Sequence, residues 1–170
     1  MIDRAYCTTM ARYDRSMNER LYALCAGLPD GERRRDLGAF FGSVHATLEH
    51  LLWADQVWLS RFTGRPRPAA GLGERLHEDF ADLRAVRAQV DAEIEAWAGR
   101  VDADWLASTL TWTSGADGAT RARPAWVLVV HLFNHQAHHR GQLTTLLTQL
   151  GHDYGVTDLP WMPGLADDPA

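Results

Sequence analysis

The fold of this chain is constrained most by four long segments with helical periodicity, at residues 5–26, 38–62, 73–98 and 124–151. Glycine and proline separate them, with Pro124 opening the last segment and Gly151 closing it, as is usual for helix ends. In the third segment, apolar residues recur three and four apart, so that they share one helical face: Leu76, Phe80, Leu83, Val86, Val90, Ile94 and Trp97. The pattern predicts an all-α four-helix bundle.

The stretch between the last two predicted helices, residues 101–123, has a different character. Residues 110–113 alternate like a short strand and residues 114–118 are rich in turn formers, so we expect a short hairpin or loop insertion before the last helix. A chain of 170 residues can bury one sizeable core and is short for two. No interdomain linker is visible, and residues 1–170 are expected to form a single domain.

Composition excludes several classes of protein. The net charge of −5 and the isoelectric point near 5.9 disfavour direct contact with nucleic acid, which usually requires a basic face. No apolar run approaches the ~20 residues of a membrane span. Cys7 and Cys25 would lie roughly 27 Å apart on the first helix, too far to form a disulfide. Free thiols and the absence of a signal peptide predict a cytoplasmic protein.

A histidine cluster marks the last predicted helix. Four of the eight histidines fall within residues 131–140, and residues four apart share a helical face. With His135 at zero on a helical wheel, the leucine stripe lies between about 20° and 80°, and His139 falls inside it at about 40°. His131 and His138 fall near −40° and −60°, at the edge. The pair aimed best at the core is therefore His135 and His139.

Two imidazoles buried on one face need polar partners, because burying them unpaired costs several kcal/mol. A shared metal ion supplies one solution; a carbonyl, water or hydroxyl for each ring is the alternative. A metal site needs a third ligand, and the second predicted helix offers several: His45, His50, Glu49 and Asp55. Periodicity alone does not choose between His45 and His50. His77 is a weaker candidate, near the start of the third predicted helix.

The last predicted helix contains no Asp or Glu. Di-iron carboxylate bundles place Glu-x-x-His motifs on two helices, and the only such spacing here is Glu74 to His77. The His-Glu-x-x-His motif of metalloproteases also fails, because Gln136 follows His135. Nitrogen ligands without carboxylates favour a divalent Zn, Ni or Fe ion over magnesium or calcium.

Several segments resemble the DinB family of DinB/YfiT-like metalloenzymes. Residues 135–142 read His-Gln-Ala-His-His-Arg-Gly-Gln, which is similar to that family's His-x-x-x-His-Arg-Gly-Gln motif. Residues 40–55 are similar to its second helix, and residues 18–22 and the tail at 151–160 match as well. The resemblance covers nearly the whole chain. It departs at Glu49, where close relatives often carry Asn.

The resemblance implies an up-down-down-up four-helix bundle, usually a homodimer. It also implies that a metal ion is held by one histidine of the second helix and by the pair on the last helix. Carried over to this sequence, these ligands are His50, His135 and His139. The helical wheel selects the same pair on the last helix, whereas only the resemblance selects His50, which precedes Leu-Leu-Trp-Ala-Asp as the family's ligand does.

Further residues are candidates for the surroundings of this site. Arg140 is expected to pair with Asp55 or another carboxylate, or else to bind an anionic substrate. Gln142 and Asn134 are candidates for orienting the imidazoles, with solvated surface as the alternative. Trp53 and Trp58 are candidates for lining a pocket, with the core as the alternative. His138 is a candidate for holding a water near the metal or for a dimer contact, and Asn18 for capping or bridging helices.

Three neutral imidazoles leave a divalent ion with its full charge and an open position, which lowers the pKa of a bound water or thiol. Relatives in the family include transferases and isomerases that use small thiols such as bacillithiol or mycothiol. We therefore expect a metal-dependent transferase that activates a small thiol for attack on an electrophile, although no catalytic base is identifiable. The alternative is a non-catalytic metal-binding or stress-response protein with a structural metal. A DNA-damage role rests on the family's name alone.

Overall fold

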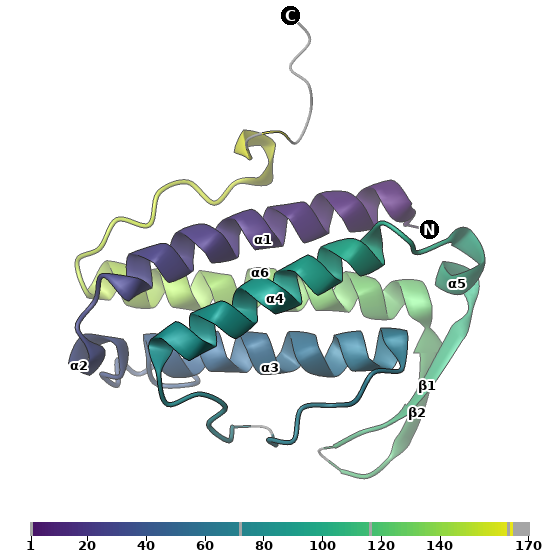
Figure 1. The fold of residues 1–170 in the computed structure, drawn as a ribbon, viewed down its shortest axis with the longest axis horizontal. Helices are drawn as coiled ribbons and strands as arrows, with labels where there is room; N and C mark the ends of the chain where they lie inside the picture. Colours follow the sequence, from purple (N-terminus) through teal and green to yellow (C-terminus); the bar gives the residue numbers. More distant parts are fainter. Residues whose placement is uncertain (1, 72, 116, 163, 165–170) are drawn as a thin grey trace, which may run out of the picture.

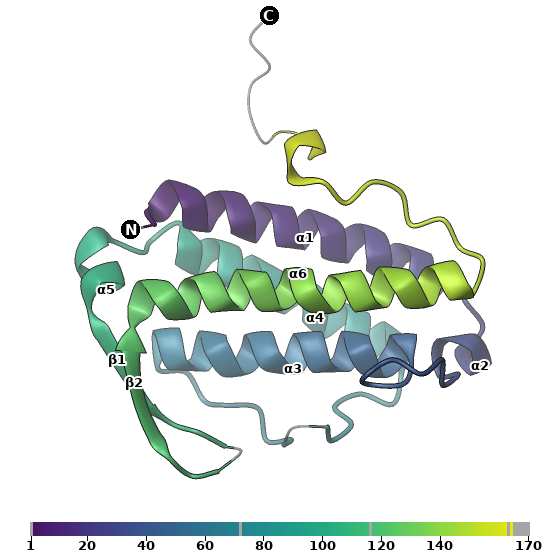
Figure 2. The ribbon, with the colours of Figure 1, turned by 180° about the vertical axis from the view of Figure 1, so that it is seen from behind.

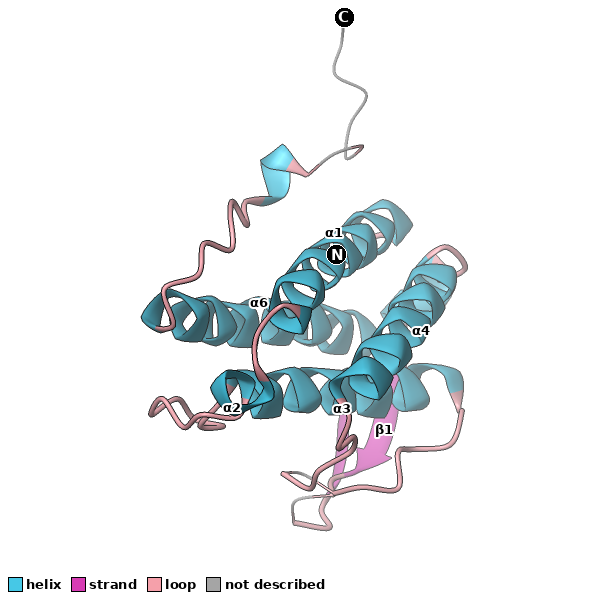
Figure 3. Ribbon diagram, turned by 60° about the vertical axis from the view of Figure 1, so that its left-hand side comes forward, coloured by secondary structure: helices cyan, strands magenta, loops and turns pink. Residues whose placement is uncertain are grey.

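The computed structural model describes residues 2–71, 73–115, 117–162 and 164. It is mostly helical, with a small two-stranded antiparallel sheet (Figures 1 and 3). The long helices are α1 (Arg4–Ala26), α3 (Val44–Thr63), α4 (Phe80–Ala98) and α6 (Ala125–Gln149). The shorter elements are α2 (Asp30–Arg33), α5 (Ala103–Ala107), β1 (Thr109–Thr113), β2 (Thr120–Pro124) and the 3₁₀ turn η1 (Leu159–Trp161). The helical prediction is confirmed, and the expected hairpin is present as β1 and β2.

The long helices pack around a common core. Figure 1 shows α1 and α6 running in one direction, and α3 and α4 in the opposite one. Helix α1 lies against α4 and α6, while α3 lies against α6 and α4. Figure 2 shows α6 and α3 side by side from the other face. The two helices that carry the candidate ligands are therefore neighbours.

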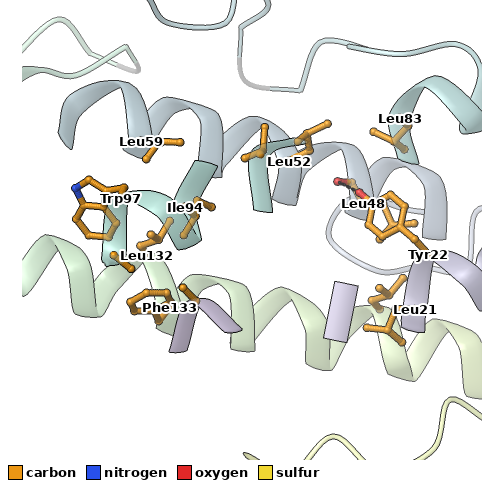
Figure 4. Close-up of a cluster of buried hydrophobic side chains, with 14 of the residues drawn as sticks. Leu21, Tyr22, Leu48, Leu52, Leu59, Leu83, Ile94, Trp97, Leu132 and Phe133 are labelled. Atoms are coloured by element: carbon orange, nitrogen blue, oxygen red, sulfur yellow. Dashed lines mark hydrogen bonds between the residues drawn. The ribbon is translucent and has the colours of Figure 1, made fainter. Parts of the chain in front are cut away.

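The core is formed by large apolar side chains from all four long helices. Leu48, Leu52 and Leu59 of α3 are at most 1% exposed, as is Leu132 of α6 (Figure 4). Burying each such side chain contributes about 1.5–3 kcal/mol relative to exposure. Among the described residues, every helix lacks either the length or the continuous apolar stretch that a bilayer-spanning segment requires.

Helix α3 begins at Val44 and not near residue 38, so the predicted start of the second helix is wrong. Gly42 has φ 77°, a left-handed conformation that interrupts a helix and favours glycine. Ser43 then caps α3, its side-chain oxygen accepting a hydrogen bond from the amide of Ala46. Phe40, which falls within the predicted but not the observed helix, is 82% exposed.

Helix α4 begins at Phe80, so the predicted start of the third helix near residue 73 is also wrong. The carboxylate of Asp79 accepts a hydrogen bond from the amide of Ala81 and caps the helix. Such a cap stabilises a helix start by about 1 kcal/mol. His77 therefore lies on the loop between α3 and α4, which packs on α3 because the amides of Leu76 and His77 donate to Glu49.

Cys7 and Cys25 both lie on α1 as free, fully buried thiols, as predicted. Burial raises the pKa of Cys7 to about 11 and that of Cys25 to about 12. Since the thiolate is the reactive form, we expect neither thiol to react with 5,5′-dithiobis(2-nitrobenzoate) at pH 8 in the native protein. Both should react at once in denaturant. Rapid native reaction of either thiol would contradict the packing of α1.

Candidate metal centre

The site is built between α3 and α6. Ser43 fixes where α3 begins, and His50 follows two turns later on the side that faces α6. On α6, His135 and His139 are four residues apart and project from one face. The structure thus brings His50 of α3 together with His135 and His139 of α6. Periodicity alone could not choose between His45 and His50 on the second predicted helix.

The nitrogen atoms of the three imidazoles converge. His50 Nε2 lies 3.2 Å from His135 Nε2, and one ring nitrogen from each of His50, His135 and His139 lies within 4.8 Å of the others. Ligand nitrogens about 2.0–2.1 Å from a tetrahedral zinc lie roughly 3.3 Å apart. The observed spacing therefore needs only small side-chain adjustments to match a common ion.

The three imidazoles are neutral at pH 7. Burial lowers the pKa of His50 to about 4, with a smaller contribution from His139. Burial, together with smaller contributions from the neighbouring histidines, lowers the pKa of His135 to about 3. The pKa of His139 is lowered mainly by burial as well. Because a metal ion binds the deprotonated imidazole, the site presents three donors without first losing protons.

The donor set fits a divalent transition-metal ion. Within the described ranges, the triad of His50, His135 and His139 is the one group of potential ligands close enough to share an ion. The Nδ1 atoms of His50 and His135 are buried and have no hydrogen-bond partner among the described residues. Three nitrogen donors without a carboxylate suit zinc, nickel or iron rather than magnesium or calcium.

Aromatic rings cover the triad on one side. Phe41 stacks on His50 with ring centroids 4.0 Å apart and tilts against His139 at 5.4 Å. Trp53 lies 6.0 Å from His50, and its indole N–H donates to the carbonyl of Ala70. Trp53 thus lines a pocket beside His50, which is one of the two roles expected for it from the sequence. Sequence reasoning missed Phe41, which belongs to the loop that we had assigned to the helix.

Gln142 holds the ring of His139. The His139 Nδ1–H donates to Gln142 Oε1 at 2.7 Å, and Gln142 Nε2 donates to His138 Nε2 at 3.3 Å. The bond fixes the proton of His139 on Nδ1, so that Nε2 is left to coordinate. His138 therefore touches the site through Gln142. Asn134, the other amide considered, is exposed.

Three residues considered as further ligands are held elsewhere. Glu49 Oε1 accepts the amides of Leu76 and His77 at 3.1 and 2.9 Å, and His45 Nε2 lies 3.2 Å from the carbonyl oxygen of His77. Asp55 pairs with Arg87 at 2.7 Å. The contacts of Glu49 and His45 tie the α3–α4 loop to α3, and that of Asp55 ties α4 to α3. All three leave the triad without a fourth protein ligand among the described residues.

Asp55 belongs to a buried polar network behind the triad. Arg87 bridges Asp55 and Asp91, at 2.7 Å to each, and Gln136 Nε2 donates to Asp55 Oδ2. Asn18 Nδ2 donates to Asp91 at 3.0 Å, so Asn18 bridges helices, one of the roles considered. Gln136 is next to His135 in the sequence, and its contact with Asp55 holds α6 against α3 at the level of the site.

Arg140 pairs with a carboxylate, as one of the expected alternatives had it, but the partner is not Asp55. Arg140 pairs with Asp14 of α1 at 2.8 Å, and its guanidinium lies 4.6 Å from the centroid of the Tyr13 ring. Arg140 is 5% exposed, so it serves as a buried α1–α6 ion pair rather than as a surface for an anionic substrate. Asp55 has Arg87 as its partner because α4 lies beside α3.

His131 and Trp58 form a separate contact at the edge of the site. Their ring centroids are 5.0 Å apart, and Trp58 also packs against Trp112 of β1. His131 lies 5.6 Å from His135 by ring centroids but is not a member of the triad. Of the two histidine pairs containing His135 four residues apart, the structure groups His135 with His139.

The chain is similar to known proteins in both sequence and structure. The model of the DinB family matches residues 1–169. The chain is 23% identical over 146 residues to the protein DinB of Bacillus subtilis (strain 168), covering 83% of this chain and 84% of that protein. The crystal structure of a DinB-like protein from Bacillus cereus ATCC 10987 superposes with a TM-score of 0.63 at 20% identity. That match covers 82% of this chain and 89% of the other.

Proposed function

The chain belongs to the DinB family, and on that premise we propose that it is a divalent-metal-dependent transferase that activates a small thiol for attack on an electrophile. The observation that supports this most directly is the convergence of three neutral imidazoles without a fourth protein ligand among the described residues. An ion held by His50, His135 and His139 would keep its full positive charge and a position for a substrate.

A bound divalent ion supplies the charge that lowers the pKa of a sulfhydryl group toward neutrality. The side chains provide its setting. His50, His135 and His139 would hold the ion, Gln142 fixes the tautomer of His139, and Phe41 packs over His50 and His139 on one side. In the reaction, the S–H proton passes to solvent, sulfur forms a bond to the electrophilic carbon, and the leaving group departs with its electron pair.

The alternative is a non-catalytic metal-binding or stress-response protein with a structural ion. Structural zinc sites are usually closed by a fourth protein ligand. Glu49, Asp55 and His45 were the residues considered for that position, and each is engaged in other contacts. The open position is the feature that favours catalysis over a purely structural ion.

The proposal also includes the topology of the bundle, the oligomeric state and the location of the protein. We assign the four long helices to the up-down-down-up bundle, on the basis of their directions in Figure 1, and propose a homodimer as the functional unit. A cytoplasmic location is supported by the free, buried thiols of Cys7 and Cys25. The net charge of −5 argues against direct contact with nucleic acid.

The function is tested by screening small thiols with 1-chloro-2,4-dinitrobenzene, using protein loaded with Zn²⁺, Ni²⁺ or Fe²⁺. We expect conjugation above the uncatalysed rate that requires the ion and disappears in His135→Ala and His139→Ala. A panel of thiols and electrophiles without any metal-dependent product, in protein that does bind metal, would favour the structural alternative.

Gln142→Leu should weaken metal binding by about 10–100-fold, the usual cost of removing a hydrogen bond to a ligating histidine. The reason is that His139 Nδ1 loses Gln142 Oε1, its hydrogen-bond acceptor among the described residues, and the ring is no longer held in one orientation. Competition with a chromogenic chelator measures the affinity. Gln149→Leu, an exposed glutamine near the end of the same helix, is the matched control and should bind metal normally. Equal affinity in the two variants would remove Gln142 from the site.

A further inference from the structure

A small cavity adjoins the triad on the side of α3 that faces the α3–α4 loop. Its volume is about 130 Å³, and His50 forms part of its wall. The other functional side chains of the wall are Phe41, Trp53, Glu49 and Glu74, with no arginine or lysine among the described lining residues. Two aromatic rings and two carboxylates thus surround a space that begins at a proposed metal ligand.

Glu49 contributes an unused acceptor to this cavity. It is 7% exposed, and its Oε1 atom accepts the two loop amides of Leu76 and His77. Its Oε2 atom has no hydrogen-bond partner among the described residues and is not among the fully buried side-chain atoms, so it is accessible to a ligand in the cavity. A ligand with N–H groups would supply the missing partner.

The charge of Glu49 is not neutralised by an ion pair with an arginine in the described part of the chain. The basic side chain near it is His45, at 3.8 Å, and burial lowers the pKa of His45, so that its ring is neutral at pH 7. Arg34 and Arg75 line the adjoining cavity but pair with Asp30 and Glu78. The described wall of the cavity beside His50 thus carries two carboxylates and no arginine or lysine.

Glu74 stands on the opposite, loop side of the cavity. Its Oε2 atom accepts the amide of Gly71 at 2.7 Å, and the side chain is otherwise exposed. Phe41 and Trp53 also line the cavity, and aromatic rings attract cations within about 6 Å of their centroids. Glu49 and Glu74 are not part of any group of three potential metal ligands in the described residues, so a second metal ion is not indicated.

We propose that the thiol substrate is an aminothiol whose ammonium group occupies this cavity while its sulfur reaches the histidine triad. The inference rests on the function proposed above and names its substrate class. The cavity volume equals that of roughly four water molecules, which suits a short aminoalkyl arm. Glu49 and Glu74 would accept the ammonium N–H groups, and the aromatic rings would cover its methylene carbons.

The test uses Co²⁺-loaded protein, in which coordination of a thiolate changes the visible absorption spectrum. Cysteamine, 2-mercaptoethanol and 3-mercaptopropionate are titrated, and the ratio of their dissociation constants is compared between wild type and Glu74→Gln. Intrinsic differences between the thiols cancel in that comparison. Glutamine keeps the hydrogen bond to Gly71 and removes only the charge. Asp82→Asn, which removes an exposed carboxylate at the start of α4 outside this cavity wall, is the matched control.

We expect wild type to favour cysteamine over 2-mercaptoethanol, with 3-mercaptopropionate weakest. Glu74→Gln should reduce the preference for cysteamine by about tenfold, the effect of one charge-assisted hydrogen bond, and Asp82→Asn should leave it unchanged. Thiol binding with equal preferences in wild type and Glu74→Gln would overturn this inference alone. Absence of any thiol-dependent spectral change would overturn the proposed function and this inference together.

Discussion

Replacing either His135 or His139 with alanine should lower the affinity for divalent metal by at least about a hundredfold, since even residues that merely orient a ligand contribute 10–100-fold. Each variant leaves two nitrogen donors where three converge within 4.8 Å, and two imidazoles do not make a stable site. The metal content of untagged protein, measured by plasma mass spectrometry after dialysis, should fall from near one ion per chain to background.

His131→Ala is the matched control for this experiment. His131 is on the same helix, one turn before His135, and its ring contacts that of His135. It lies outside the triad, and its replacement should leave the metal content unchanged. Loss of metal in His131→Ala, with retention in His139→Ala, would show that the other histidine pair binds the ion. Retention in both His135→Ala and His139→Ala would refute the site.

The second large effect concerns stability. Arg87→Met should destabilise the protein by about 3–5 kcal/mol, because removing one member of a buried ion pair leaves its partners charged and unpaired. Arg87 is 2% exposed and holds both Asp55 and Asp91, which are 1% and 4% exposed. Burial alone would raise the pKa of each carboxyl group, and Arg87 opposes that rise. Urea unfolding followed by circular dichroism measures the change.

Arg15→Met provides the matched comparison at the surface. Arg15 also contacts two carboxylates, those of Glu19 and Glu95, but its side chain is 43% exposed. Solvent screens such pairs, and the expected loss is below about 1 kcal/mol. If Arg87→Met cost no more than Arg15→Met, the buried network would not be what holds α3 and α4 together.

The sequence predicted the features that depend on local spacing. Residues four apart on a helix must share a face, so His135 and His139 could be paired before any tertiary structure was known. The last helix, predicted at 124–151 and found at Ala125–Gln149, followed from its flanking proline and glycine. The first helix and the hairpin followed from periodicity and turn residues in the same way. The starts of α3 and α4 were wrong because apolar residues of the preceding loops happened to continue the helical period.

What the sequence by itself determined is thus the order of the helices and the pair of histidines on α6, since both depend on interactions within a few residues. The tertiary structure decided which residues of other elements meet that pair. It placed His50 rather than His45 opposite His135, brought Phe41 over both helices, and gave Arg140 to Asp14 and Arg87 to Asp55. Such partners are chosen by the rotation of each helix about its axis and by its neighbours, which are set by the packing of the whole core and not by the spacing within one segment.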